Sequence, residues 1–566
     1  MKAVLIYNKS NQFGLKVDVE IVEKLLTERG VSIKIADPLE PPSPCDVAIH
    51  FEVPIYGYVP WAKTNYLLCN PEWYEDEAWL PYLKRFDGVI FRSIEARKAF
   101  SLKNPSIKTH LIYWSALTTS ISSMTPQSTN HKDGFVWFLG GSVNKRAAAL
   151  KLVPLWKTSY PPLHIYTTVP MGVSRSETLK ITVQDLTLTQ RKGLAAFFPG
   201  HICISEAEGF GYTAAEAEKN GAFMLLNPLP VYKESYPIDK GIAWVNEMTT
   251  ECLDDAIAKF MSSDLETVRL SQKKHSEDKD SVFLSMFDAF WQSVDKVVAS
   301  KAQTQGQGQG QLPPLLAVED CPPISIITLL YNRRKFFDLA CHNIMLSDYP
   351  KDKIEWIIVE DSDDPNEDAS DRVVQVGLNA APLQLAYMPL EKKTPIGQKR
   401  NLGIEKAKND IILMMDDDDH LPETAIRRRV AWLIKSPLPD TKATACTTIA
   451  CYDLIRGVSA VNTPPWNLPL RKRISEATLT FYKTWWKEQP FDTTSMAEGE
   501  GLLKGREQDL LEMPPQQILV AFSHSKNTSG SRQLPKEAKT GCFWGFPKEY
   551  LLYIHKLAGV EVEEDA

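Results

Sequence analysis

The sequence predicts an α/β protein with parallel sheets, divided into at least two domains. Its 566 residues greatly exceed the length that one ordinary hydrophobic core organises. Short apolar runs alternate with stretches of helical spacing, a pattern typical of parallel sheets flanked by helices. A run in which Gln and Gly alternate, within residues 301–314, divides this pattern in two. The chain is therefore expected to fold as two α/β halves with a connecting segment.

The first half contains two successive sets of apolar runs. The first set comprises residues 3–7, 46–51 and 88–91, with helical spacing at residues 17–26. The second set opens at residues 134–139 and recurs at residues 163–166. Two such sets in tandem indicate two Rossmann-like lobes, which we assign to residues 1–125 and 126–298.

The connecting segment is assigned to residues 299–318. Alternating Gln and Gly can neither pack into a core nor hold one backbone conformation, so this segment is expected to be a flexible linker. The last domain then comprises residues 319–566.

One motif of the second lobe has the composition of a donor site. It reads Glu208-Gly209-Phe210-Gly211 and leads into a helical stretch that carries Glu216. Glycines let a backbone amide approach a phosphate, and the following helix N-terminus favours an anion. A plain loop with an amphipathic helix is the alternative interpretation of a lone Gly-x-Gly.

The whole string resembles the retaining glycosyltransferases of family 4, which have the GT-B fold. That resemblance implies that Glu208 contacts the donor hexose and Glu216 the ribose. It also implies that Lys145 and Arg146, after a Gly-rich turn, lie near the donor diphosphate.

The most informative motif of the last domain is a run of four carboxylates. The apolar run 411–415 ends abruptly in Asp416, Asp417, Asp418 and Asp419. Adjacent like charges raise pKa values and weaken a fold unless a cation is present. Carboxylate oxygens at a strand end suit Mg²⁺ or Mn²⁺, although a solvated acidic turn is the alternative.

Two further strands give this run a context. Residues 324–330 form an apolar run followed by Tyr331-Asn332-Arg333, and residues 354–359 form another that ends in Glu360-Asp361. With the Asp-x-Asp that follows residue 415, these features resemble the family 2 glycosyltransferases of GT-A fold, over about residues 323–532.

The resemblance implies roles for several acidic residues. Asp361 would accept a hydrogen bond from the nucleotide base, and Asp416 would lie by the ribose. Asp418 would ligate the metal that bridges the diphosphate, with Asp419 as a second ligand. His524 follows an apolar strand and is either a metal-site residue or a structural hydrogen-bonding residue.

Two other segments complete the predicted site. Lys399 and Arg400 resemble the family's basic loop and helix start, where they would face the nucleotide-sugar; a solvated basic helix end is the alternative. The segment 491–503 resembles the acceptor-side acidic motif that supplies the general base in inverting enzymes. We favour Glu500 as that base, with Glu498 as the alternate.

Composition bears on the cellular compartment and on the classes of partner that the protein could bind. Nine Cys without metal-ligand spacing fit reduced thiols, and Met1-Lys2 leads straight into a short apolar run, so a cytoplasmic protein is expected. A net charge of −7 gives no support for nucleic-acid binding, and no apolar run is long enough for a transmembrane segment.

Together these features predict a bifunctional enzyme. A retaining, metal-independent GT-B module would be joined to a metal-dependent, inverting GT-A module, and both would transfer sugars from nucleotide-sugar donors to a glycan or glycoconjugate. The alternative is one active GT-A enzyme with a non-catalytic, carbohydrate-binding or scaffolding first half.

Overall fold

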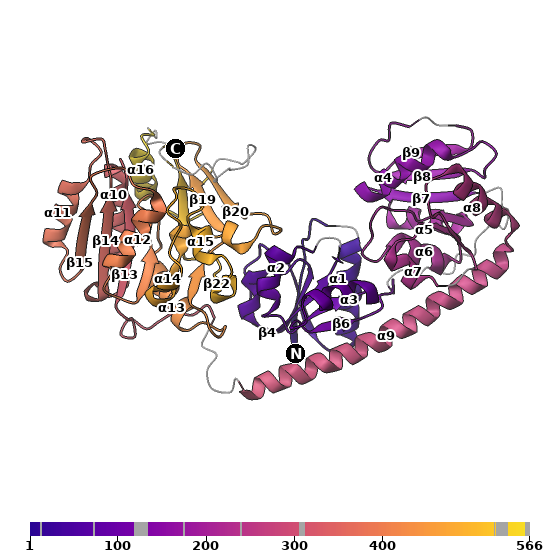
Figure 1. The fold of residues 1–566 in the computed structure, drawn as a ribbon, viewed down its shortest axis with the longest axis horizontal. Helices are drawn as coiled ribbons and strands as arrows, with labels where there is room; N and C mark the ends of the chain where they lie inside the picture. The colour runs from indigo at the N-terminus through magenta and orange to yellow at the C-terminus, as the bar shows by residue number, and fades with distance from the viewer. Residues whose placement is uncertain are drawn as a thin grey trace.

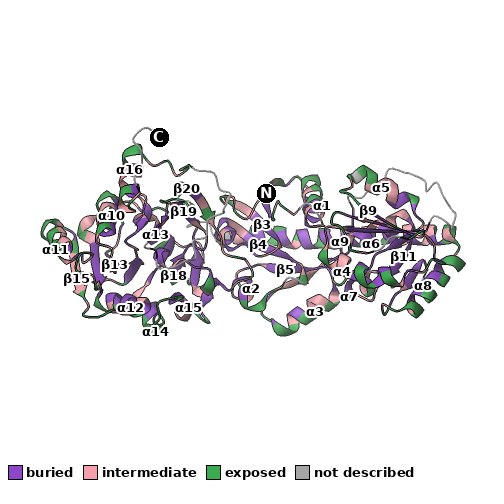
Figure 2. Cartoon of the chain, turned by 90° about the horizontal axis from the view of Figure 1, so that it is seen from above, coloured by how far each residue is buried: buried purple, intermediate pink, exposed green. Residues whose placement is uncertain are grey.

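The computed structural model describes all residues except 12–13, 72–73, 118–133, 174–175, 238–239, 305–311, 526, 528–540 and 561–566. The described chain forms three α/β bodies, and the first lobe lies between the second lobe and the carboxyl-terminal domain (Figure 1). Figure 2 shows that the strands of each body are buried while the outer helix faces are exposed. The core clusters follow the three sheets, but some are shared between bodies: Trp61, Tyr56 and Tyr82 of the first lobe pack into clusters of the carboxyl-terminal domain.

The first lobe is a six-stranded parallel sheet of order β2-β1-β3-β4-β5-β6. Its strands are β1 (Lys2–Ile6), β2 (Ser32–Ala36), β3 (Cys45–Glu52), β4 (Ala62–Cys69), β5 (Gly88–Phe91) and β6 (Thr109–Leu111). Its helices are α1 (Gly14–Glu28), α2 (Asp76–Leu83) and α3 (Ile94–Lys103). The predicted parallel sheet is confirmed for this lobe.

The second lobe is also a six-stranded parallel sheet, of order β12-β11-β10-β7-β8-β9. Its strands are β7 (Phe135–Gly140), β8 (Leu163–Thr167), β9 (Leu179–Val183), β10 (Gly200–Ile202), β11 (Phe223–Leu226) and β12 (Ile242–Trp244). Its helices are α4 (Val143–Leu152), α5 (Leu188–Phe197), α6 (Tyr212–Asn220), α7 (Pro230–Ser235) and α8 (Thr250–Ser262). The strand order reverses at β7 and β10, which is the doubly wound arrangement.

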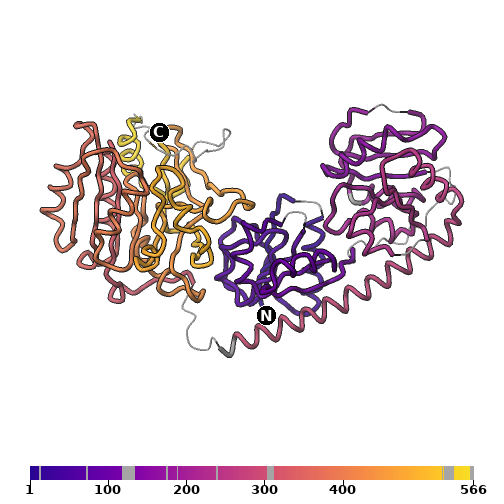
Figure 3. Tube along the Cα trace, viewed as in Figure 1, coloured from indigo at the N-terminus to yellow at the C-terminus, as the bar shows by residue number. Residues whose placement is uncertain are grey.

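A single long helix, α9 (Leu265–Thr304), runs from the second lobe along the first, as the trace in Figure 3 shows. Its buried residues Phe283, Phe287, Phe290 and Trp291 join the core cluster of the first lobe. Val298 is buried in the same cluster. The helix continues to Thr304 and therefore includes the first residues of the predicted linker, which was assigned to residues 299–318. Residues 305–311 of that linker lie outside the described residues.

The carboxyl-terminal domain combines a seven-stranded mixed sheet with a four-stranded sheet. The larger sheet has the order β15 (Gln384–Pro389), β14 (Ile354–Glu360), β13 (Ile324–Leu330), β16 (Ile411–Met414), β21 (Thr480–Tyr482), β18 (Ala443–Ala445) and β22 (Leu510–Glu512). The smaller sheet has the order β17 (Asp419–His420), β23 (Val520–Ser523), β19 (Ile449–Asp453) and β20 (Val458–Asn462). The helices are α10 (Arg334–Leu346), α11 (Ser370–Asn379), α12 (Ile396–Lys406), α13 (Ala425–Ile434), α14 (Lys483–Glu488), α15 (Gly499–Leu503) and α16 (Lys548–Leu557).

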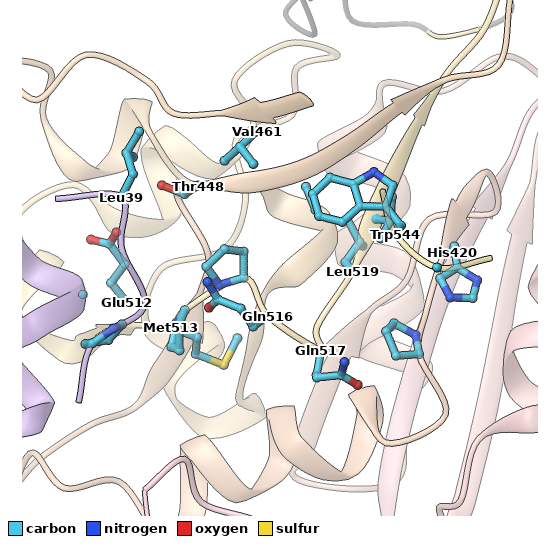
Figure 4. Close-up of a pocket in the computed structure, with 18 of the residues that line it drawn as sticks. Leu39, His420, Thr448, Val461, Glu512, Met513, Gln516, Gln517, Leu519 and Trp544 are labelled. Atoms are coloured by element: carbon cyan, nitrogen blue, oxygen red, sulfur yellow. The ribbon is translucent and has the colours of Figure 1, made fainter. Parts of the chain in front are cut away.

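The first lobe and the carboxyl-terminal domain are packed against each other. The Trp79 indole nitrogen donates to the Trp466 carbonyl oxygen at 3.2 Å, and Arg85 donates to backbone carbonyls of Gln508 and Leu510. A cavity of about 860 Å³ lies between the two bodies (Figure 4). Within the described residues, no helix has the length and hydropathy needed to span a bilayer.

Candidate functional site

The candidate site lies where three neighbouring parallel strands of the larger sheet end. The register pairs Leu330 of β13 with Glu360 of β14, and Ile327 of β13 with Met414 of β16. The turns that follow these strands therefore meet at one sheet edge, which is where open α/β sheets bind ligands. This topology brings Arg333, Asp361 and the Asp416–Asp419 run into one region.

Three carboxylates of the acidic run converge. One oxygen from each of Asp416, Asp418 and Asp419 lies within 4.8 Å of the others. Asp418 and Asp419 are buried, whereas Asp416 is half-buried. Oxygen ligands gathered in this way suit a hard divalent cation such as Mg²⁺ or Mn²⁺.

The surroundings of Asp418 are arranged around its negative charge. Its Oδ2 lies 2.8 Å from Arg333 Nη1, 3.1 Å from His524 Nε2 and 3.1 Å from Asn527 Nδ2. The His524 ring also stacks on Phe336, with ring centroids 4.2 Å apart. His524 therefore has both a position beside the carboxylate cluster and a structural packing contact.

Asp417 shows how crowded the acidic run is. Burial raises the pKa of its carboxyl group to about 7, although Arg333 Nη1 contacts its Oδ1 at 3.0 Å. Among the described residues, no hydrogen-bond partner is found for Asp417 Oδ2. The charges of Asp417 and Asp418, in turn, raise the pKa of Arg333 despite its burial. One guanidinium thus serves several carboxylates, and an added cation would relieve the remaining repulsion.

Asp361 and Lys399 form a buried ion pair at the end of β14. Lys399 Nζ lies 2.5 Å from Asp361 Oδ1, and the Thr394 backbone N–H donates to Asp361 Oδ2 at 2.7 Å. Burial lowers the pKa of Lys399. The solvated basic helix end is therefore not what the structure shows, because Lys399 points inward at Asp361.

Arg400 is buried on the next position of α12 and joins two acidic segments. Its Nη2 lies 3.7 Å from Asp416 Oδ1, and its Nε donates to Glu498 Oε1 at 3.1 Å. The fold therefore connects Asp416 to the predicted acceptor-side segment through a single guanidinium.

A cavity of about 730 Å³ opens beside these groups. It is lined by Asp416, Asp418, Glu498 and Glu500, among other residues. Glu498 is only 6 % exposed, whereas Glu500 is half-buried. Both predicted candidates for the general base thus line the cavity that Asp416 and Asp418 also line.

Sequence reasoning missed Glu476, which lines the same cavity. Burial and the nearby Glu498 raise the pKa of Glu476 to about 7, against the opposing effect of Arg400. Glu476 is a single acid in a 3₁₀ turn at Glu476–Thr478, without a motif around it. Only the tertiary fold brings it to the site. Arg333 was named only as part of the Tyr331-Asn332-Arg333 turn after β13, without a role in the site.

The two predicted donor glutamates of the second lobe, Glu208 and Glu216, each pair with a basic side chain. Lys145 Nζ lies 3.4 Å from Glu208 Oε1 and donates to Thr213 Oγ1 at 2.7 Å. Arg191 Nη2 contacts Glu216 Oε2 at 2.6 Å.

The glycines of the same motif lie at the start of α6. Gly211 is the N-cap of that helix with φ of +85°, a conformation that favours glycine, and Gly209 lies in the preceding turn. Arg146 lies on α4 and is half-buried.

Comparison with known proteins gives a match to a region that contains part of the strand-end site. Residues 325–446 match the family model described as glycosyl transferase family 2. A stretch of 109 residues is 24% identical to poly(ribitol-phosphate) beta-N-acetylglucosaminyltransferase TarS of Staphylococcus aureus, strains Mu50 and MW2. That alignment covers 19% of this chain and 18% of the relative, so the chain spans less than a fifth of those relatives.

Two solved structures are similar at low scores. The mannosyltransferase PcManGT from Pyrobaculum calidifontis, in complex with GDP-Man and Mn²⁺, has 15% identity and a TM-score of 0.30, over 41% of this chain and 64% of that one. S. aureus TarS 1–349 in complex with UDP-GlcNAc has 17% identity and a TM-score of 0.27, over 36% and 60%. The prediction of a glycosyltransferase domain in the second half is confirmed by the family match.

Proposed function

We propose that the carboxyl-terminal domain is a metal-dependent, inverting GT-A glycosyltransferase. It transfers a sugar from a nucleotide-sugar to a hydroxyl group of a glycan or glycoconjugate. The observation that carries this proposal is the convergence of Asp416, Asp418 and Asp419 at the strand ends, inside the region that matches the family 2 model.

Asp418, Asp419 and His524 would hold Mg²⁺ or Mn²⁺, with Asp416 beside the ribose. A cation bound there neutralises the charge of a diphosphate leaving group. Asp361 would accept a hydrogen bond from the nucleotide base, and its ion pair with Lys399 fixes the position of that carboxylate before the donor binds.

The acceptor enters the cavity of about 730 Å³. Glu500 takes the proton from the acceptor hydroxyl as that oxygen attacks the anomeric carbon, while the bond to the leaving group breaks. Glu498 is the alternate base, but its Oε1 already accepts a hydrogen bond from Arg400. The half-buried position of Glu500 is what favours it.

The curated relatives narrow the choice of donor to test first. They are named as N-acetylglucosaminyltransferases, so a nucleotide-activated N-acetylglucosamine is the first donor to try on this chain. Hexose and pentose donors complete the panel.

We also propose that the first half is a retaining, metal-independent GT-B transferase, which makes the chain bifunctional. The Glu208–Lys145 pair supports this, because it presents a carboxylate and a cation beside the glycine-rich start of α6. The Glu216–Arg191 pair adds a second carboxylate and cation, from within α6 and from α5. The alternative is a non-catalytic, carbohydrate-binding or scaffolding half. Metal-independent nucleotide-sugar turnover that is lost in Glu208→Gln is the property that separates the two.

The proposal is tested on the full chain with a panel of nucleotide-sugars, by release of the nucleoside diphosphate. Release with at least one donor should require Mg²⁺ or Mn²⁺ and fall to background with excess chelator. Absence of release with every donor, or release that is indifferent to metal and persists in Asp418→Ala, would refute the GT-A assignment. Loss of a metal-independent part of the release in Glu208→Gln would support the second active site.

A further inference from the structure

One segment of the carboxyl-terminal domain lies between the catalytic cavity and the first lobe. This wall segment, residues 463–477, lines the cavity that contains Asp416 and Glu500. Its cavity-lining members are Thr463, Pro464, Pro465, Arg471, Lys472, Arg473, Ile474, Ser475, Glu476 and Ala477. The same segment makes several of the contacts to the first lobe.

Two of these contacts come from α2 of the first lobe. The Trp79 indole N–H donates to the Trp466 carbonyl oxygen at 3.2 Å. Glu77 forms an ion pair with Arg471, whose other nitrogen contacts Glu507 Oε1 at 3.1 Å. Arg471 is thus held between the first lobe and its own domain.

A third contact fixes Arg473, which is only 2 % exposed. Its guanidinium carbon lies 4.4 Å from the ring centroid of Trp466 and 5.8 Å from that of Tyr56, a first-lobe residue. Tyr56 in turn stacks on Tyr82 of α2.

Few hydrogen bonds hold this guanidinium. Its Nη2 reaches Thr447 Oγ1 at 3.5 Å, and Nε and Nη1 find no hydrogen-bond partner among the described residues. The buried carboxyl of Glu512 also interacts with it: burial raises the pKa of Glu512, and the charge of Arg473 opposes that rise. The aromatic rings and this charge therefore orient the guanidinium together.

The β19–β20 hairpin of the carboxyl-terminal domain lies between two cavities: the catalytic cavity and the cavity that faces the first lobe. Thr447, Ile449 and Asn462 line the catalytic cavity. Their chain neighbours Thr448, Ala450 and Val461 line the cavity between the bodies instead. Alternate strand residues point to opposite faces, so one hairpin separates the catalytic cavity from the first lobe. Figure 4 shows Leu39 of the first lobe, Thr448 and Val461 among the residues that line the second cavity.

We propose that the first lobe is a structural part of the GT-A site, and that it positions the wall segment through Tyr56 and Glu77. This inference rests on the proposed GT-A function. Tyr56 and Glu77 touch no reacting group and act through Arg473 and Arg471, so they are positioning residues. The first lobe would then serve both modules at once, and the GT-A reaction would depend on its docking.

The first test needs no substrate. Hydrogen–deuterium exchange is measured on the full chain, comparing wild type with Tyr56→Ala and Glu77→Lys. Exchange in peptides from the wall segment should accelerate by roughly fivefold or more, while peptides of β13 and β14 stay unchanged. Tyr56→Phe keeps the ring and should restore wild-type exchange. Unchanged exchange in the wall segment in both variants would overturn the inference.

A matched control is available on the same helix. Asp76 is the neighbour of Glu77 and pairs with Lys103 of the first lobe, 3.6 Å away. Asp76→Lys makes the same charge change at the same helix end without a contact across the interface. It should leave the wall segment at wild-type exchange; equal acceleration by Asp76→Lys and Glu77→Lys would show a general loss of first-lobe stability and overturn the inference.

The second test is catalytic. With the nucleotide-sugar that the panel selects, Tyr56→Ala and Glu77→Lys should lower metal-dependent turnover by roughly fivefold, and Tyr56→Phe should recover it. Faster exchange with wild-type turnover would show that the wall segment needs no positioning for the reaction. If no nucleotide-sugar is turned over by wild type, the proposed function fails, while the exchange result still decides whether the first lobe orders the wall segment.

Discussion

The two candidate donor sites of this chain differ in how many basic side chains neutralise their carboxylates. In the second lobe, Glu208 and Glu216 each face a separate cation, Lys145 and Arg191. In the carboxyl-terminal domain, Asp417 and Asp418 share the single guanidinium of Arg333. The second-lobe site is therefore balanced by its own side chains, whereas the strand-end site has excess negative charge that a divalent cation would neutralise. The proposal that one module needs a metal and the other does not rests on this difference.

The largest effect is expected from removing a metal ligand. Asp418→Ala should lower metal-dependent turnover by about 10³-fold, because the diphosphate loses its bridging cation and the loss amounts to several kcal/mol of charge stabilisation. Initial rates over a range of Mn²⁺ concentrations measure this. Asp371→Ala, which removes only a surface ion pair with Arg334, should remain within twofold of wild type. A near-normal rate in Asp418→Ala would contradict the proposal that the strand-end site needs a divalent cation.

A somewhat smaller effect is expected at the acceptor side. Glu500→Gln should bind donor and metal normally but lose transfer by about 10²-fold or more, as expected for a general base. Donor affinity by calorimetry and transfer by product release should therefore separate. Normal transfer in Glu500→Gln together with loss in Glu498→Gln would move the role to Glu498. A product with retained anomeric configuration would remove the inverting mechanism.

The strand-end site shows what sequence alone could reveal. Asp416, Asp418 and Asp419 were predictable because an apolar strand that ends in several acids has few structural explanations. His524 was predictable as a candidate because it directly follows an apolar strand. Glu476 was not, because neither its neighbours nor its 3₁₀ turn mark it, and only burial beside Glu498 makes it unusual.

The fold shows the same limit. The core strands β1, β3, β5 and β7 follow apolar runs that the sequence displays. The edge strand β2 is partly exposed, because Ser32 and Lys34 alternate with apolar residues along it. Strand β4 contains the buried polar residues Thr64 and Asn65. Neither segment is therefore an apolar run in the sequence. Their identity depends on pairing with neighbouring strands, as does the docking of the first lobe on the last domain, which involves residues far apart in sequence.

Crowding of charge at the strand-end cavity should also be visible in stability. The native protein holds the Glu476 proton up to about pH 7, whereas an unfolded carboxyl loses it near pH 4.5. The stability associated with this buried, protonated group is therefore fully present below pH 4.5 and declines as the pH rises toward 7. When the pH is raised from 5 to 8, the free energy of unfolding of Glu476→Gln should rise by roughly 2 kcal/mol relative to that of wild type. Denaturation midpoints at both pH values measure this, and a pH-independent difference would contradict it.

The smallest effect is expected from chelator in an Asp418→Ala background. It should change the remaining nucleotide-sugar turnover by less than about twofold. The reason is that the second-lobe site supplies its own cations and has no need of a metal. Lys145 and Arg191 provide those cations, at 3.4 Å from Glu208 and 2.6 Å from Glu216. In the same background, Lys145→Gln should remove most of that turnover, whereas Lys151→Gln, whose partner is the exposed Glu206, should not. A strong chelator effect would show that both modules use metal. No turnover at all in the Asp418→Ala background would favour the scaffolding alternative for the first half, and the two sites would then differ because only one of them is catalytic.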